Sequence, residues 1–107
     1  LDAARSHHLA ALEHAEASDD VFAIALGLEG IGTTLVAAGE ARRGVELIAA
    51  GLAAREKAGN PLPAGEWSEV DRACDAAGRQ LDAAEFAAAL ESGRSLDVEE
   101  AVALARP

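Results

Sequence analysis

The chain has 107 residues, carries a formal net charge of −10 at pH 7, and is 50% hydrophobic but only 3% aromatic. This length supports a single domain with a modest core. The acidic balance argues against a surface for nucleic acid or anionic lipid, because both need an excess of Lys and Arg. A hydrophobic fraction made mostly of alanine favours helices whose backbones approach closely.

Helical periodicity runs along the whole chain, and no segment alternates apolar and polar residues, so we predict an all-α fold of about six helices. The first helix is expected over residues 2–17, with Leu9 and Leu12 on its apolar face. Asp19 or Asp20 can then accept hydrogen bonds from the free N–H groups that open the next helix.

Residues 20–58 are predicted to form two long helices folded back on each other. Gly39 lies between them, where a helix end favours a residue that tolerates positive φ, and so short a turn makes the helices antiparallel neighbours. Apolar residues in both helices follow the spacing of one helix face: Leu28, Ile31 and Leu35 in the first, and Val45, Ile48 and Leu52 in the second.

Shorter helices follow the hairpin. Pro61 and Pro63 cannot continue a helix, so residues 60–63 are expected to form a rigid connector. The next helix is expected over about 64–77, and its apolar face consists of Trp67, Val70, Cys74 and Ala77.

Two further helices share one N-terminal signal. Asp82 and Asp97 each precede a glutamate by three residues, which is the spacing of a capping box. Phe86 and Leu90 supply the core face of the first of these helices, and Val98, Val102 and Leu104 supply contacts in the second. Glycines are expected to end four of the helices: Gly39, Gly59, Gly78 and Gly93.

Residues 21–39 contain a single charge, Glu29, and could be mistaken for a membrane span. Glycines and threonines dilute this stretch, and a charge near the bilayer centre is costly, so we predict a buried helix of a water-soluble fold. The N-terminus lacks the apolar run of a signal peptide. Cys74 is the single cysteine, which excludes an intrachain disulfide and is typical of the reducing cytoplasm.

Small residues occur at fixed intervals in the hairpin. Gly44 follows Gly32 by twelve residues, and Gly51 follows Gly44 by seven. With Leu28, Ile31, Leu35 and Ile48, this pattern resembles a tetratricopeptide repeat, a 34-residue helix–turn–helix unit. The resemblance implies antiparallel hairpins stacked as a right-handed superhelix. Two features depart from it: Pro61 comes later than the usual proline, and aliphatic residues replace aromatic ones at the bulky positions.

The C-terminal part carries a more specific pattern. Its runs LIAAGLAAREKAGNPLPAGEW (residues 47–67) and LDAAEFAAALESGRSLDVEEAVALAR (residues 81–106) resemble the end of a large group of bacterial regulators. Those regulators join an ATPase module of the signal-transduction class to helical repeats, often with a LuxR-type or SARP-type DNA-binding domain. The resemblance covers residues 22–106 and leaves the effector domain open.

We therefore expect one helical-repeat domain over residues 1–107. It would comprise the second helix of a truncated repeat (1–18), a helix–turn–helix repeat (19–59) and C-terminal capping helices (60–107). The chain also opens within a helical pattern and without Met, which suggests a piece of a longer protein.

The resemblance implies a non-catalytic, cytoplasmic protein-interaction and sensor module. Its partner would be another domain of the parent chain or a peptide, with self-association as a two-fold dimer as a further expectation. Two alternatives stay open: a regulatory arm of a signalling enzyme, either an adenylyl cyclase or a kinase, and a stand-alone helical bundle that binds a ligand.

We find no catalytic constellation and expect neither enzyme activity nor a cofactor. His7, His8 and His14 lack the i,i+4 pair of helical metal ligands. Cys74 has no histidine nearby in the sequence to activate it. The glycines of residues 27–32 lack the Lys-Ser/Thr pair of a phosphate loop.

Three residues of the predicted packing allow more than one role. Glu29 could pair with Arg42 or Arg43 across the hairpin, or line a ligand groove. Trp67 could anchor the core at the end of the stack or contact a partner, while Phe86 is expected in the core.

The glycines of the hairpin give a stability expectation. If Gly32, Gly44 and Gly51 lie at helix contacts, a large side chain overpacks the interface, so Gly51→Leu should destabilise strongly. Gly51→Ala should be near neutral, because helix propensity offsets crowding. Gly27 should tolerate Ala better than Gly32.

Overall fold

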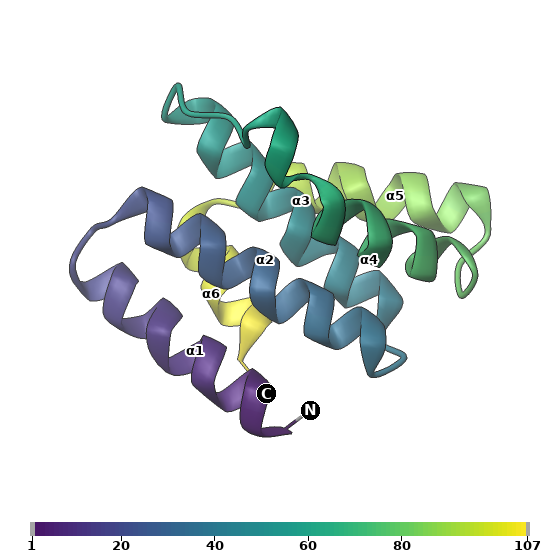
Figure 1. The fold of residues 1–107 in the computed structure, drawn as a ribbon, viewed down its shortest axis with the longest axis horizontal. Helices are drawn as coiled ribbons and strands as arrows, with labels where there is room; N and C mark the ends of the chain where they lie inside the picture. Colours follow the sequence, from purple (N-terminus) through teal and green to yellow (C-terminus); the bar gives the residue numbers. More distant parts are fainter. Residues whose placement is uncertain (1, 107) are drawn as a thin grey trace.

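The chain folds as a bundle of helices (Figure 1). The computed structural model describes residues 2–106, and over this range it contains six α-helices, one 3₁₀-helix and no strand, which confirms the all-α prediction. No helix in this range is long and apolar enough to cross a bilayer. In chain order the elements are α1 (Asp2–Ala17), α2 (Val21–Ala37), α3 (Ala41–Lys57), the 3₁₀-helix η1 (Ala64–Glu66), α4 (Ser68–Gly78), α5 (Ala83–Arg94) and α6 (Val98–Ala105).

Helices α2 and α3 form the predicted antiparallel hairpin, and the other α-helices pack on it. Asp20 begins α2, since its carboxylate accepts a hydrogen bond of 3.1 Å from the N–H of Ala23. Gly39 makes the turn between α2 and α3 with a φ of +89°, and Gly59 follows α3 with a φ of +73°. Both values lie in the left-handed region that glycine adopts without strain.

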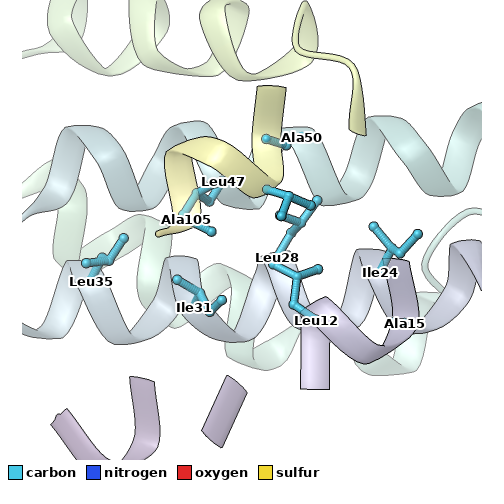
Figure 2. Packing of buried hydrophobic residues seen from close by; sticks show 11 residues of the cluster. Leu12, Ala15, Ile24, Leu28, Ile31, Leu35, Leu47, Ala50 and Ala105 are labelled. Atoms are coloured by element: carbon cyan, nitrogen blue, oxygen red, sulfur yellow. The ribbon is translucent and has the colours of Figure 1, made fainter. Parts of the chain in front are cut away.

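Two apolar clusters lie on two sides of the hairpin. The first joins α1, α2, α3 and α6, and Figure 2 shows the side chains of these helices pointing toward one another. The second joins the end of α2 with α3, α4 and α5. The predicted core positions of the hairpin are buried, apart from the half-buried Leu52: Leu28, Ile31, Leu35, Val45 and Ile48.

Helix α6 returns to the side of the hairpin that α1 occupies and does not extend the row of helices beyond α5 (Figure 1). It contributes Ala101, Val102 and Ala105 to the first cluster. Small residues suit this position, because α6 fills the space between α1 and α3, which contact each other little. The expected C-terminal capping helices therefore divide: α4 and α5 cover one side, and α6 completes the other.

The α4–α5 pair does not repeat the geometry of the central hairpin. Helix α5 packs mainly on α3 and has few contacts with α4. Residues 2–106 measure 37 × 31 × 26 Å along their principal axes and contain one extensively packed hairpin, α2–α3. The tetratricopeptide-like superhelix stays a prediction.

Helix boundaries differ from the sequence expectation in two places. Helix α4 begins at Ser68, because residues 64–66 form a 3₁₀ turn after Pro63. Gly93 lies inside α5, where a Cβ would collide with the backbone of α3 at Glu46, so this glycine permits close approach and does not end the helix. Both predicted capping boxes are confirmed: Asp82 with Glu85, and Asp97 with Glu100.

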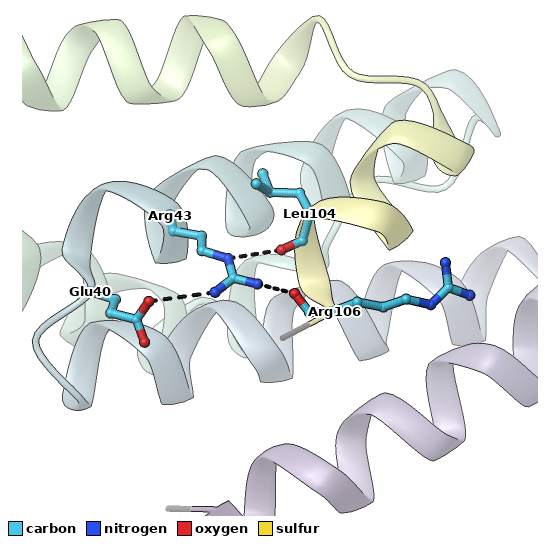
Figure 3. Close-up of polar contacts among 4 residues, drawn as sticks. All are labelled: Glu40, Arg43, Leu104 and Arg106. Atoms are coloured by element: carbon cyan, nitrogen blue, oxygen red, sulfur yellow. Dashed lines mark hydrogen bonds and ion pairs between the residues drawn. The ribbon is translucent and has the colours of Figure 1, made fainter.

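Arg43 of α3 donates hydrogen bonds to the C-terminal end of α6, as Figure 3 shows. Its Nε donates a hydrogen bond of 2.8 Å to the carbonyl oxygen of Leu104, and its Nη2 donates one to the carbonyl oxygen of Arg106. Carbonyl groups at a helix C-terminus have no partner within the helix and attract a cation. Glu40 lies on the other side of the guanidinium, 3.4 Å from Nη1.

We expect Arg43→Ala to lower the free energy of unfolding by about 1–2 kcal/mol, because two carbonyl groups at the end of α6 lose charged hydrogen-bond donors. Arg42→Ala is the matched control, since Arg42 is exposed and lies 3.9 Å from Glu46, and a surface pair contributes less than about 1 kcal/mol. Urea unfolding measures both variants. Equal midpoints for the two would show that Arg43 does not hold α6.

Candidate interaction groove

Exposed apolar side chains gather at the start of α2. Within residues 2–106, Val21, Phe22 and Leu26 are the large hydrophobic residues that are well exposed, and Phe22 and Leu26 expose 54% and 56% of their surface. Phe22 and Leu26 are four residues apart and so lie on one face of the helix. Because these two side chains are continuous with the lining of a groove, this face of α2 is a candidate contact surface.

A groove of about 480 Å³ runs along this face, between α1 on one side and the η1–α4 segment on the other. On α2 its lining extends from Phe22 to Thr33, a distance of about 16 Å at 1.5 Å per residue. His7 and His8 line the wall formed by α1, and Glu66 and Glu69 line the opposite wall. The groove thus combines an apolar strip on α2, which contains Phe22 and Leu26, with an acidic wall formed by Glu66 and Glu69.

A buried ion pair between α2 and α3 also lines the groove. Nε of Arg55 lies 2.7 Å from Oε2 of Glu29, and Nη2 lies 2.9 Å from Oε1, so the pair is bidentate. Arg55 exposes 4% of its surface and Glu29 exposes 7%. Removing either charge would leave the other one buried without its partner.

Phe22 lies next to this ion pair. The guanidinium carbon of Arg55 is 5.0 Å from the centre of the Phe22 ring, within the range of a cation–π interaction. Arg55 uses Nε and Nη2 for Glu29, and its Nη1 donates no hydrogen bond within residues 2–106. The ion pair therefore supports one side of the exposed aromatic ring.

The electrostatics of the pair keep Arg55 charged. Its hydrogen bond with Glu29 raises the pKa of the guanidinium, burial acts in the opposite direction, and the carboxylates of Glu29 and Glu66 raise the pKa further. Because the two charges of the pair cancel, the carboxylates of Glu66 and Glu69 determine the net charge of the groove at neutral pH.

The predicted partner of Glu29 was wrong. Arg42 lies near Glu46 and Arg43 binds the end of α6, while Arg55 pairs with Glu29. The contact between Glu29 and Gly51 explains this, because Arg43 lies about 12 Å along α3 from Gly51 at 1.5 Å per residue. Glu29 is therefore both paired and part of the groove.

The predicted packing glycines lie at helix contacts. A Cβ built on Gly32 would lie 2.7 Å from the carbonyl oxygen of Gly44, and one built on Gly44 would lie 2.6 Å from that of Gly32. A Cβ on Gly51 would lie 2.9 Å from the carbonyl oxygen of Ala25 and 2.9 Å from Cγ of Glu29. The expectation that Gly51→Ala is near neutral is therefore revised to a net loss.

Trp67 and Phe86 do not line the groove. Both are half-buried and pack against the second cluster. They line a second cleft of about 500 Å³ between α3, α4 and α5, which shares Leu62 and Val70 with the groove. The indole N–H of Trp67 donates a hydrogen bond of 3.0 Å to the carbonyl oxygen of Leu62. This bond fixes the connector against α4, which favours the role of a core anchor.

The histidines and Cys74, which are the remaining candidates for catalysis or metal binding, do not form a common site. The rings of His7 and His8 meet edge to face with centroids 6.1 Å apart, and His14 is exposed. Among residues 2–106 no group of three or more His, Cys, Asp or Glu side chains could hold a metal ion. Cys74 is half-buried, and burial, with smaller contributions from Asp71 and Asp75, raises the pKa of its thiol, which lowers its thiolate fraction.

No family model, characterised relative or solved structure matches this chain. The resemblance to bacterial regulators thus rests on the two C-terminal runs, and the site rests on the geometry of the groove.

Proposed function

We propose that this chain is a non-catalytic protein-interaction module of the tetratricopeptide-repeat type, and that the groove along α2 is its binding site. The main support is the exposure of Phe22 and Leu26 beside a fixed, buried ion pair. A few anchor residues contribute most of the energy in protein interfaces, where aromatic residues such as Phe are enriched, and a preorganised site loses little conformational entropy on binding.

The chemistry of the groove supports binding more than catalysis. Glu29 and Arg55 occupy each other with two short hydrogen bonds, and the raised pKa of Arg55 keeps its proton bound. A general acid or base needs a pKa near the working pH. The ion pair instead positions Phe22 and holds α2 against α3.

In this proposal the module forms the C-terminal end of a cytoplasmic bacterial regulator of the LuxR or SARP type, as the resemblance of residues 22–106 suggests. It relays the binding of a protein segment to the ATPase and effector parts of that regulator. Fold alone does not determine function, so the binding site is the part of the proposal to test first.

A random peptide display library selected on this chain tests the proposal. We expect selected peptides to bind with a Kd that rises by about tenfold or more in Phe22→Ser/Leu26→Ser, since both anchors are lost. Val21→Ser is the matched control, because Val21 is exposed on α2 but does not line the groove. Isothermal titration calorimetry gives each Kd, and circular dichroism checks the fold.

Either of two results would contradict the proposal. One is the absence of any selected peptide. The other is a set of peptides that bind Phe22→Ser/Leu26→Ser as tightly as they bind the unmodified chain.

A further inference from the structure

The acidic wall of the groove restricts the partner. Glu66 and Glu69 are exposed, and their carboxylates make no hydrogen bond or close ion pair within residues 2–106. The remaining charged groups of the lining, Glu29 and Arg55, neutralise each other. A ligand that places a cation at this wall gains Coulomb attraction and meets no free Arg or Lys in the lining. The net charge of −10 acts in the same direction over a longer range.

The apolar strip calls for a ligand with an apolar face. Phe22 and Leu26 expose more than half of their surface at the groove. The lining of α2 extends over about three helical turns, which corresponds to apolar side chains at i, i+4 and i+7 of a partner helix. A fully polar ligand would leave this strip in contact with water and gain little from it.

The α2 side of the groove offers few hydrogen-bonding groups to a peptide backbone, and the polar side chains of the two walls lie to either side of it. The hydroxyl of Thr33 donates to the carbonyl oxygen of Gly30 at 2.9 Å, and Glu29 accepts from Arg55. An extended peptide must find partners for its own N–H and C=O groups, whereas a helix satisfies them internally. The lining therefore fits a helix better than a strand.

We infer that the partner of this groove is a basic amphipathic helix of another protein. Its apolar face packs on Phe22 and Leu26, and Lys or Arg side chains at its edge lie near Glu66 and Glu69. This inference rests on the proposed function, since it names the class of segment that the same groove binds.

Three matched synthetic peptides test the inference by titration calorimetry. They share leucines at helical spacing and carry lysine, glutamine or glutamate at every polar position. We expect the lysine peptide to bind about tenfold more tightly than the glutamine peptide, and the glutamate peptide to bind more weakly still. In Phe22→Ser/Leu26→Ser the Kd for the lysine peptide should rise by about tenfold or more.

Charge variants separate the groove from the overall acidity of the chain. Glu66→Gln/Glu69→Gln should remove most of the preference for lysine over glutamine. Glu91→Gln/Glu99→Gln makes the same change of charge at exposed residues outside the groove and should retain that preference. If both double variants weaken the lysine peptide equally, general attraction explains the binding and the inference is wrong.

The two proposals fail in different ways. Should the glutamine or glutamate peptide bind as tightly as the lysine peptide, and lose binding in Phe22→Ser/Leu26→Ser, the groove would be an interaction site for another class of segment. The inference alone would then be wrong. If the Kd of every peptide is the same in Phe22→Ser/Leu26→Ser as in the unmodified chain, both the inference and the proposed function are wrong.

Discussion

Glu29→Ala is expected to lower the free energy of unfolding by about 3 kcal/mol, because the guanidinium of Arg55 stays buried without its carboxylate. Arg55 exposes 4% of its surface and forms both of its side-chain hydrogen bonds with Glu29. The urea midpoint should therefore fall with little change in slope.

Two further variants make this measurement specific. Glu29→Met/Arg55→Met replaces both charges by flexible apolar side chains and should recover part of the loss, because neither charge stays buried alone. Glu91→Ala removes one partner of an exposed pair, 4.0 Å from Arg94, and should change stability by less than about 1 kcal/mol. A loss in Glu29→Ala no larger than that in Glu91→Ala would show that water reaches the ion pair.

Substitution of the hairpin glycines should give the second large effect. Gly44→Ala is expected to cost about 1–3 kcal/mol, despite a gain in helix propensity of about 1 kcal/mol. Its Cβ would lie 2.6 Å from the carbonyl oxygen of Gly32 and 2.9 Å from the backbone nitrogen of Val36. Because backbone atoms cannot rotate away, α2 and α3 must separate.

The chain offers graded controls for this effect. Gly78→Ala has no atom within 4 Å of its added Cβ and should be neutral or stabilising. Gly27→Ala should cost less than Gly32→Ala, since its nearest neighbour is Cβ of Leu12 at 3.1 Å. Gly51→Leu should cost about 3 kcal/mol or more, and more than Gly51→Ala. If Gly44→Ala proves as stable as Gly78→Ala, close backbone packing does not hold the hairpin together.

Local signals in the sequence predicted the helices well. Asp20, Asp82 and Asp97 cap helices because their side chains satisfy backbone N–H groups a few residues away, which needs no knowledge of the rest of the fold. Gly39 and Gly59 make turns because their own backbone has a positive φ. The spacing of Gly32, Gly44 and Gly51 also predicted which faces of α2 and α3 meet.

Tertiary contacts were harder to predict. Gly93 resembled a helix end, but it lies where α5 touches α3, and its own sequence neighbourhood does not distinguish these roles. The position of α6 depends on Arg43, sixty-one residues before Leu104. The apolar pattern of α6 does not distinguish its two possible positions. The same residues could cover the end of a stack of helices or fill the space between α1 and α3.

Part of the groove could have been predicted. Phe22 and Leu26 lie off the face that carries Leu28, Ile31 and Leu35, so a second apolar face on α2 was visible in the sequence. The choice of Arg55 over Arg43 was not predictable from the register alone, because Gly32 facing Gly44 places Glu29 nearer Arg43 than Arg55 along α3. The acidic wall was not predictable, because Glu66 and Glu69 reach the groove only through the path of the connector after Pro63.

Chemical-shift mapping by NMR most directly tests whether the groove along α2 is the binding site. The isotopically labelled chain is titrated with the lysine–leucine peptide, and the perturbed amides are assigned. We expect the largest shifts between Phe22 and Thr33, around His7 and His8, and around Glu66 and Glu69, with α5 and α6 unchanged. Perturbations centred on α5, which carries Phe86, or on α6 would contradict the assignment of this groove as the binding site.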